Sequence, residues 1–130
     1  SQGYLVIFTF QHQEIYSYTA SERLVADFNL PAQMGATIVS GSQAHQPHGF
    51  AFDSGAFIHY GLGNLFFDQY HYCTDYACDR AFIDRHVFYA GRHISTELIP
   101  IRFMDMARPR LMIPDEAPRF LEIIFTASGW

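Results

Sequence analysis

Imidazole and carboxamide side chains, which bind metals or anions, gather in three short segments of this sequence. The densest, residues 43–48 (QAHQPH), holds two imidazoles and two carboxamides in six positions. The others are residues 11–14 (QHQE) and residues 61–64 (GLGN). The first two of these segments in the chain follow an expected strand and the third ends one, where a scaffold fixes side chains while water and ligand still reach them. We therefore expect a site built from these loops, with the candidates Gln11, His12, Glu14, Gln43, His45, His48 and Asn64.

Each candidate also has a purely structural interpretation. His12 is equally consistent with a surface histidine after a strand, and Glu14 with a solvated loop carboxylate instead of a general base. His45 could bond to the backbone, and His48 could simply occupy a turn. Asn64 follows a glycine in a segment where unusual backbone dihedrals are expected, so it could serve the backbone and not a substrate.

The elements that position the first two segments form a strand, a helix and a strand. Residues 4–10 (YLVIFTF) are almost wholly apolar, as in a strand covered on both faces. Ser21 predicts a helix N-cap, with the helix over residues 23–34. Pro31 inside this pattern predicts a kink or a break near residue 30. With a strand over residues 37–40, the order predicts a parallel βαβ unit with a right-handed crossover.

The rest of the pattern predicts two hairpins and a last helix. Pro100 has no amide hydrogen, so its strand is expected at a sheet edge or to end there. His59 lies within a strand, where a packed or surface residue is more probable than a ligand. No linker composition appears, so we expect one domain over residues 1–130, of mixed α/β (α+β) class. The further strands are expected at residues 49–52, 56–62, 81–89 and 93–102, and the helix at residues 115–128.

Composition excludes several classes of function. The net charge of −5 argues against a nucleic-acid binder. All eight basic residues are Arg, which excludes a lysine nucleophile or Schiff base in this chain. Charged residues make up only 16%, so we expect part of the surface to lie against another domain or subunit. Glycosidase carboxylate pairs, a G-x-S-x-G elbow, a phosphate loop and a dinucleotide fingerprint are not found.

The cysteines, the apolar windows and the start of the chain give three further expectations. Cys73 and Cys78 lack the spacing of a structural zinc site; two free thiols are the favoured interpretation, and a local disulfide is the alternative. No window approaches the roughly 18 apolar residues of a membrane span. The chain begins almost directly with a strand, so we expect a fragment of a longer protein.

Three motifs, in order, resemble the bacterial capsule synthesis or poly-γ-glutamate biosynthesis (CapA-like) family of the calcineurin-like metallophosphoesterase superfamily. That family has a strand followed by H-W-G-x-E-Y, and residues 10–16 are FQHQEIY. It then has an apolar strand and G-H-H-P-H, where residues 41–45 are GSQAH. Its Y-S-L-G-N-F-x-F-D corresponds to YGLGNLFFD at residues 60–68. The resemblance covers residues 4–68, and residues 69–130 are expected to be a C-terminal extension.

This resemblance implies a fold and a location. The chain would be the C-terminal part of a two-sheet metallophosphoesterase-like sandwich with flanking helices, followed by a hairpin and a helix. The family's earlier Asp-x-His, Gly-Asp and Gly-Asn-His motifs lie N-terminal to the region that resembles it here, so the N-terminal half of the same protein, or another domain, would be the partner. The family works in the bacterial cell envelope, outside the cytoplasm, in capsule or poly-γ-glutamate synthesis or export.

The resemblance also implies roles for the candidates. A divalent metal (Mn, Fe or Zn) would be held by His12, His45 and His48, for metal-assisted hydrolysis or transfer. Glu14 would be a general base, and His45, which keeps its motif position, has the strongest case. Gln11 and Gln43 stand where the family has histidines, so the metal site is either degraded or remodelled. In a remodelled site, these two carboxamides would hold substrate or water. Asn64 would also contact the substrate.

The rival function is not enzymatic. The lost histidines and the low charge are consistent with a domain that binds a polysaccharide or polyanion, or that docks on a partner. The aromatic segment of residues 66–76 would then form the contact. A homodimer that covers an exposed sheet is a third, weaker possibility.

Overall fold

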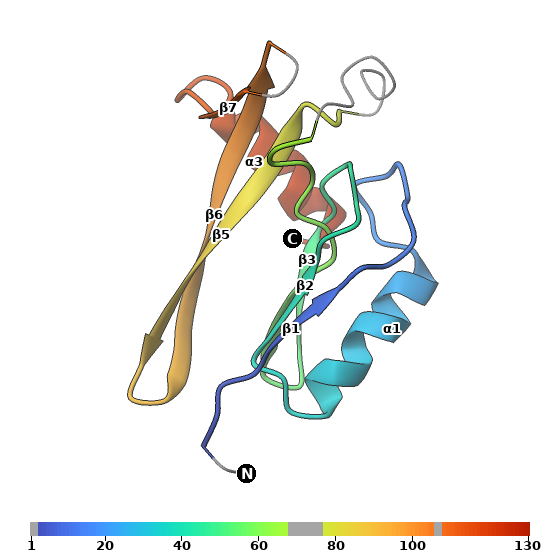
Figure 1. The fold of residues 1–130 in the computed structure, drawn as a ribbon, viewed down its shortest axis with the longest axis vertical. Helices are drawn as coiled ribbons and strands as arrows, with labels where there is room; N and C mark the ends of the chain where they lie inside the picture. Colours follow the sequence, from blue (N-terminus) through green and yellow to red (C-terminus); the bar gives the residue numbers. More distant parts are fainter. Residues whose placement is uncertain (1–2, 68–76, 106–107) are drawn as a thin grey trace.

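The computed structural model of this chain describes residues 3–67, 77–105 and 108–130, which form two β-sheets and two helices (Figure 1). The fold class is therefore mixed α/β, as predicted. The elements are β1 (Ile7–Phe10), α1 (Glu22–Gln33), β2 (Ile38–Gly41), β3 (Phe50–Asp53), β4 (Ala56–His59), β5 (Arg80–Tyr89), β6 (Arg92–Met104), β7 (Arg108–Leu111) and α3 (Ala117–Ala127).

The first sheet has the strand order β1-β2-β4-β3. β1 pairs parallel with β2, and β2 pairs parallel with β4, whereas β3 is antiparallel to β4. The prediction of a parallel β1–α1–β2 unit is thus confirmed. Because β1, β2 and β4 run in one direction, the loops that follow all three emerge at the same edge of the sheet, and these loops carry the candidate residues.

Each face of the first sheet has its own core. Val39 and Ile58 point to the side of α1, where they pack with Leu24 and Phe28. Their neighbours along the strands point to the other side, because successive side chains of a strand alternate. There, Ile38, Phe50 and Phe57 pack with Phe82 of β5 and with Phe120 and Ile124 of α3. The first sheet is therefore the middle layer, with α1 on one face and the second sheet and α3 on the other (Figure 1).

The second sheet is antiparallel, with β6 between β5 and β7. Pro100 thus lies in a central strand, and the expectation of an edge strand is wrong. Its carbonyl oxygen accepts from Met112 N at 3.0 Å, just beyond the last registered pair of β6 and β7, Ile101 and Leu111. In a strand, the N–H and the C=O of one residue point to the same side. The amide hydrogen that Pro100 lacks would therefore point toward the side of β7, at a position where β7 has already ended.

Two further expectations, one about α1 and one about Cys78, need correction. α1 runs unbroken through Pro31 to Gln33, because Phe28, Pro31 and Ala32 are buried and their packing outweighs the lost hydrogen bond. Cys78 is disulfide-bonded, so the preferred interpretation as a free thiol is wrong. Cys73 lies outside the described residues.

β1 is shorter and more exposed than its sequence predicts. It begins at Ile7, not at residue 4, and it is an edge strand. Its apolar side chains are between 39% and 78% exposed over residues 4–8. A run of this kind is normally covered on both faces, so the expected cover is not supplied by the described residues.

A buried ion pair joins the two sheets. His59 of β4 is fully buried, and its Nδ1 donates to Oδ2 of Asp84 on β5 at 2.7 Å. Its Nε2 donates to the carbonyl oxygen of His48 at 3.2 Å. Both ring nitrogens face acceptors, so the doubly protonated ring, which is positively charged opposite the carboxylate, satisfies both contacts. His59 is therefore a packed structural residue, as the sequence favoured.

We predict that Asp84→Asn lowers the free energy of unfolding by about 3–5 kcal/mol, because it leaves the charge of His59 buried without its partner. Urea unfolding followed by circular dichroism measures the change. Asp115→Asn, at an exposed carboxylate, is the control and should change stability by less than about 0.5 kcal/mol. An Asp84→Asn protein as stable as the original would contradict the ion pair.

The N-cap of α1 gives a second stability prediction. Ser21 Oγ accepts from the backbone N–H of Leu24 at 3.2 Å. Ser21→Ala should lower the free energy of unfolding by about 1 kcal/mol, whereas Ser21→Thr should retain most of it, because threonine also caps helices. Equal midpoints for all three proteins in urea would show that this cap contributes nothing.

Candidate functional site

The loops after β1, β2 and β4 meet at the carboxyl edge of the first sheet. Nε2 of Gln11, just after β1, donates to Oε1 of Gln43, just after β2, at 2.7 Å. The backbone N–H of Ser42 donates to the carbonyl oxygen of Phe10 at 2.8 Å, which extends the β1–β2 ladder into the loops. Segments 32 residues apart are thereby held side by side, as their parallel strands predicted.

These loops line a cavity of about 480 Å³. Its polar groups come from the three segments singled out in the sequence and from Ser42, which precedes one of them. Its apolar wall is formed by residues that follow β4 and by Phe82 of β5. The lining residues are Gln11, Ser42, Gln43, His45, Leu62, Gly63, Asn64, Leu65, Phe66, Phe67 and Phe82.

His45 is held in one orientation inside this cavity. Its Nδ1 donates to Oδ1 of Asn64 at 2.6 Å, and its ring lies against that of Phe67 with centroids 4.9 Å apart. Nε2 therefore carries no hydrogen in the neutral ring. This atom makes no hydrogen bond to any of the described residues. Oε1 of Glu14 lies 3.8 Å from it.

Close backbone contacts explain the glycines next to Asn64. Gly63 has φ of +79°, and a Cβ there would lie 2.6 Å from the carbonyl oxygen of Arg80. A Cβ on Gly61 would lie 2.5 Å from Cδ2 of His48. Only glycine allows these approaches, which turn Asn64 inward to 6% exposure. The same segment therefore makes the close contacts of Gly61 and Gly63 and places Asn64 against His45.

His48 lies behind the cavity and not in it. Its side chain is fully buried, with Nδ1 against the carbonyl oxygen of Ser17 at 2.5 Å and Nε2 without a partner among the described residues. Burial lowers the pKa of His48, which favours the neutral ring; the Ser17 carbonyl opposes this shift, and the nearby charge of His59 adds to it. This geometry corresponds to the structural interpretation of His48.

His12 is turned toward α1. Its Nε2 donates to Oδ2 of Asp27 at 2.7 Å, and its ring contacts those of Phe10 and Phe28. Neither His12 nor Glu14 is among the lining residues, although Glu14 reaches His45.

The candidates do not converge as a metal site. His12, His45 and His48 have separate partners in Asp27, Asn64 and the Ser17 carbonyl. Within the described ranges, no group of three or more His, Cys, Asp or Glu side chains is placed to hold a metal ion. The described residues by themselves therefore do not fit the metal that the resemblance implies. They do bring Gln11, Gln43, His45 and Asn64 together around one cavity.

Sequence reasoning found the polar groups but not the whole apolar wall. Phe66 and Phe67 belong to the aromatic segment expected to form a contact, and they are 79% and 51% exposed. The remainder of that segment, with Asp68 of the third motif, lies outside the described residues. Phe82 was missed, because nothing in the sequence connects β5 with the end of β4. The antiparallel bridge between Gly63 and Ala81 makes that connection.

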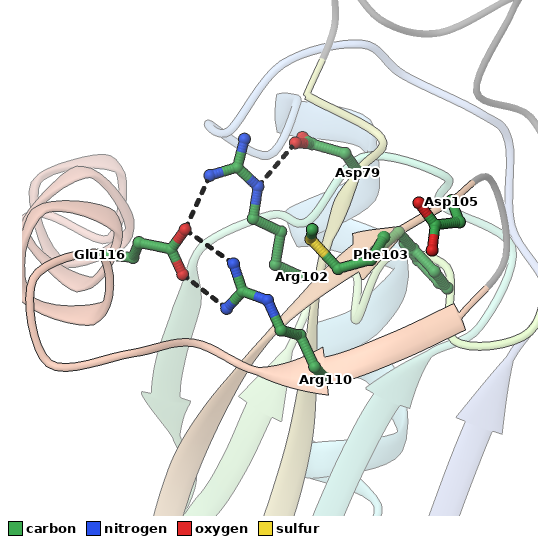
Figure 2. Close-up of a pocket in the computed structure, with 7 residues that line it drawn as sticks. Asp79, Arg102, Phe103, Asp105, Arg110 and Glu116 are labelled. Atoms are coloured by element: carbon green, nitrogen blue, oxygen red, sulfur yellow. Dashed lines mark hydrogen bonds and ion pairs between the residues drawn. The ribbon is translucent and has the colours of Figure 1, made fainter.

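A second cavity, of about 490 Å³, lies beside the start of α3 (Figure 2). Arg110 makes two hydrogen bonds to Glu116, at 2.6 and 2.8 Å, and Arg102 bridges Glu116 and Asp79 at 2.9 and 3.3 Å. Hydrogen bonds from Arg110 lower the pKa of Glu116 to about 2. Each guanidinium thus has a carboxylate of this chain as its partner, so the network ties α3 to the second sheet.

Comparisons with known proteins identify no family. No protein-family model matches the chain, and no curated protein matches it. Among the described residues, neither helix has the length and apolar character needed to cross a bilayer.

The orientation of His45 can be measured directly. Nitrogen-15 NMR should show the ring with its hydrogen on Nδ1, because Asn64 Oδ1 accepts it. Asn64→Leu removes the acceptor and should shift the ring toward the form with the hydrogen on Nε2, while the signals of His86 on β5 stay unchanged as an internal control. Identical His45 nitrogen shifts in both proteins would contradict this contact.

Proposed function

We propose that this chain is the C-terminal part of a CapA-like protein of capsule or poly-γ-glutamate synthesis or export, and that its edge cavity binds a polysaccharide segment without hydrolysing it. The observation that carries the binding role is the cavity lined by Gln11, Gln43, His45 and Asn64, together with exposed aromatic rings. The observation that weighs against catalysis is the engagement of His12 and His48 elsewhere.

The lining chemistry supports a sugar ligand. Carboxamides both donate and accept hydrogen bonds, which suits the hydroxyl groups of a glycan. Gln43 Nε2 makes no hydrogen bond within the described part of the chain, so we expect it to bond to a ligand. Phe66 and Phe67 offer flat apolar faces beside these groups. No arginine lines the cavity, which disfavours a polyanion as the ligand of this site.

The open edge of β1 supports a partner in the N-terminal half of the same protein. The carbonyl oxygens of Val6 and Phe10 bond to the β2 side, so Ile7 and Thr9 direct their backbone groups outward. A further strand added there would complete a larger sheet and cover the exposed run of residues 4–8. In our proposal, this larger sheet is one of the two sheets of the metallophosphoesterase-like sandwich. The disulfide at Cys78 supports an extracytoplasmic location, since disulfides persist in oxidising compartments.

Metal-assisted hydrolysis or transfer is the second candidate. It is favoured by one observation, the 3.8 Å approach of Glu14 to His45. The further ligands would have to come from outside the described residues. Metal analysis of the full-length protein tests it: bound Mn, Fe or Zn that is lost in His45→Ala would favour catalysis over binding.

The binding role is tested with defined oligosaccharides of glucose, N-acetylglucosamine and glucosamine, and with poly-γ-glutamate. Amide chemical shifts in NMR titrations should change at residues 43–45 and 62–67 with at least one oligosaccharide. Gln43→Ala should weaken that binding about tenfold through the loss of hydrogen bonds. Gln13→Ala, which removes an exposed carboxamide outside the cavity, should leave it unchanged.

Two outcomes would overturn the binding role. Binding of poly-γ-glutamate at the cavity in preference to every oligosaccharide would reject a sugar ligand. Shifts that map to the second cavity, around Arg102 and Glu116, would place the ligand elsewhere.

A further inference from the structure

We infer that the cavity recognises a protonated amine carried by its ligand, as in an amino sugar; this inference rests on the proposed binding role. The geometry behind it is the convergence of two hydrogen-bond acceptors, of which Oε1 of Glu14 also accepts from the hydroxyl of Tyr16. Nε2 of His45 and Oε1 of Glu14 lie 3.8 Å apart. This separation is too long for a hydrogen bond between them.

The hydrogen on Nδ1 determines what Nε2 can do. Because Nδ1 donates to Asn64, Nε2 of the neutral ring offers a lone pair and accepts. The carboxylate of Glu14 also only accepts. A ligand group that bonds to both must therefore donate twice. A hydroxyl has one hydrogen to donate, whereas an ammonium group has three, so the amine fits this pair of acceptors better.

Charge favours the same ligand. No arginine lines the cavity, and the whole chain has no lysine and a net charge of −5. The side chain of Glu14 is 31% exposed, so its carboxylate is accessible from solvent. Arg102 and Arg110, which could otherwise attract anions, are engaged with Asp79 and Glu116 at the second cavity (Figure 2). An ammonium group at this position would meet the negative charge of Glu14, whose Oε1 accepts a hydrogen bond from the neutral hydroxyl of Tyr16.

The aromatic residues strengthen the preference. The ring of Phe67 lies against His45, and Phe66 next to it is 79% exposed. A cation over the face of an aromatic ring is attracted by the electron density of that face. Neutral sugars also pack on such faces, so the rings by themselves do not select an amine. The selection comes from Glu14 and His45.

The experiment compares three oligosaccharides of equal length, made of glucosamine, N-acetylglucosamine and glucose, by isothermal titration calorimetry at pH 6.5, where a glucosamine oligomer is largely charged. We expect the glucosamine oligomer to bind about tenfold more tightly than the other two, because hydrogen bonds to charged groups are the stronger ones. Glu14→Gln keeps the shape of the side chain and should abolish this preference. The matched control is Glu22→Gln, at an exposed carboxylate of α1, which should preserve it.

The outcomes separate the amine inference from the proposed binding role. Equal affinity for all three oligosaccharides overturns the amine inference and leaves the binding role standing. Failure of all three to bind removes both. A preference for glucosamine that survives Glu14→Gln overturns the assignment to this pair of acceptors.

A separate arm uses spermidine, which is an amine without a sugar. Binding as tight as that of the glucosamine oligomer would support amine recognition while removing the sugar from the proposed function. Weak binding of spermidine, with tight binding of the glucosamine oligomer, would support both claims.

Discussion

The ion pair between His59 and Asp84 is the contact on which the position of the candidate loop depends. Transferring two charges from water to the interior is unfavourable unless they are paired and hydrogen-bonded, and here Oδ2 of Asp84 and the carbonyl oxygen of His48 accept both hydrogens of the ring. The pair links β4 of the first sheet to β5 of the second. Through the His48 carbonyl it also fixes the end of the loop that carries Gln43 and His45.

Close backbone approaches add a second constraint on the same edge. A Cβ on Gly41, at the end of β2, would lie 2.1 Å from the carbonyl oxygen of Tyr60, so only glycine lets the two loops run this close. Gly61 allows the ring of His48 to pack against the segment that leads to Asn64. The cavity therefore stands on rigid backbone contacts and on a buried ion pair, which is the support that a preorganised binding site requires.

The histidines show why residue type alone does not define chemistry. Three imidazoles lie in the candidate loops, yet one bonds to Asp27 of α1, one to the Ser17 carbonyl, and only His45 lines the cavity among the described residues. Two positions where the resembling family has metal-binding histidines hold Gln11 and Gln43, and these bond to each other. In our proposal, a site with this composition recognises hydrogen-bonding groups, and the nearby carboxylate of Glu14 favours ligands that donate.

Hydrophobic periodicity and the order of the elements predicted the parallel β1–α1–β2 unit, the hairpins and the edge where Gln11, Gln43 and Asn64 gather, because these signals lie within short segments. Tertiary packing set the partners of His12 and His48, the place of Pro100 in a central strand and the contribution of Phe82 to the cavity. These depend on contacts between distant segments, such as the bridge from Gly63 to Ala81, for which periodicity carries no signal. Packing against those segments also outweighed local preference at Pro31.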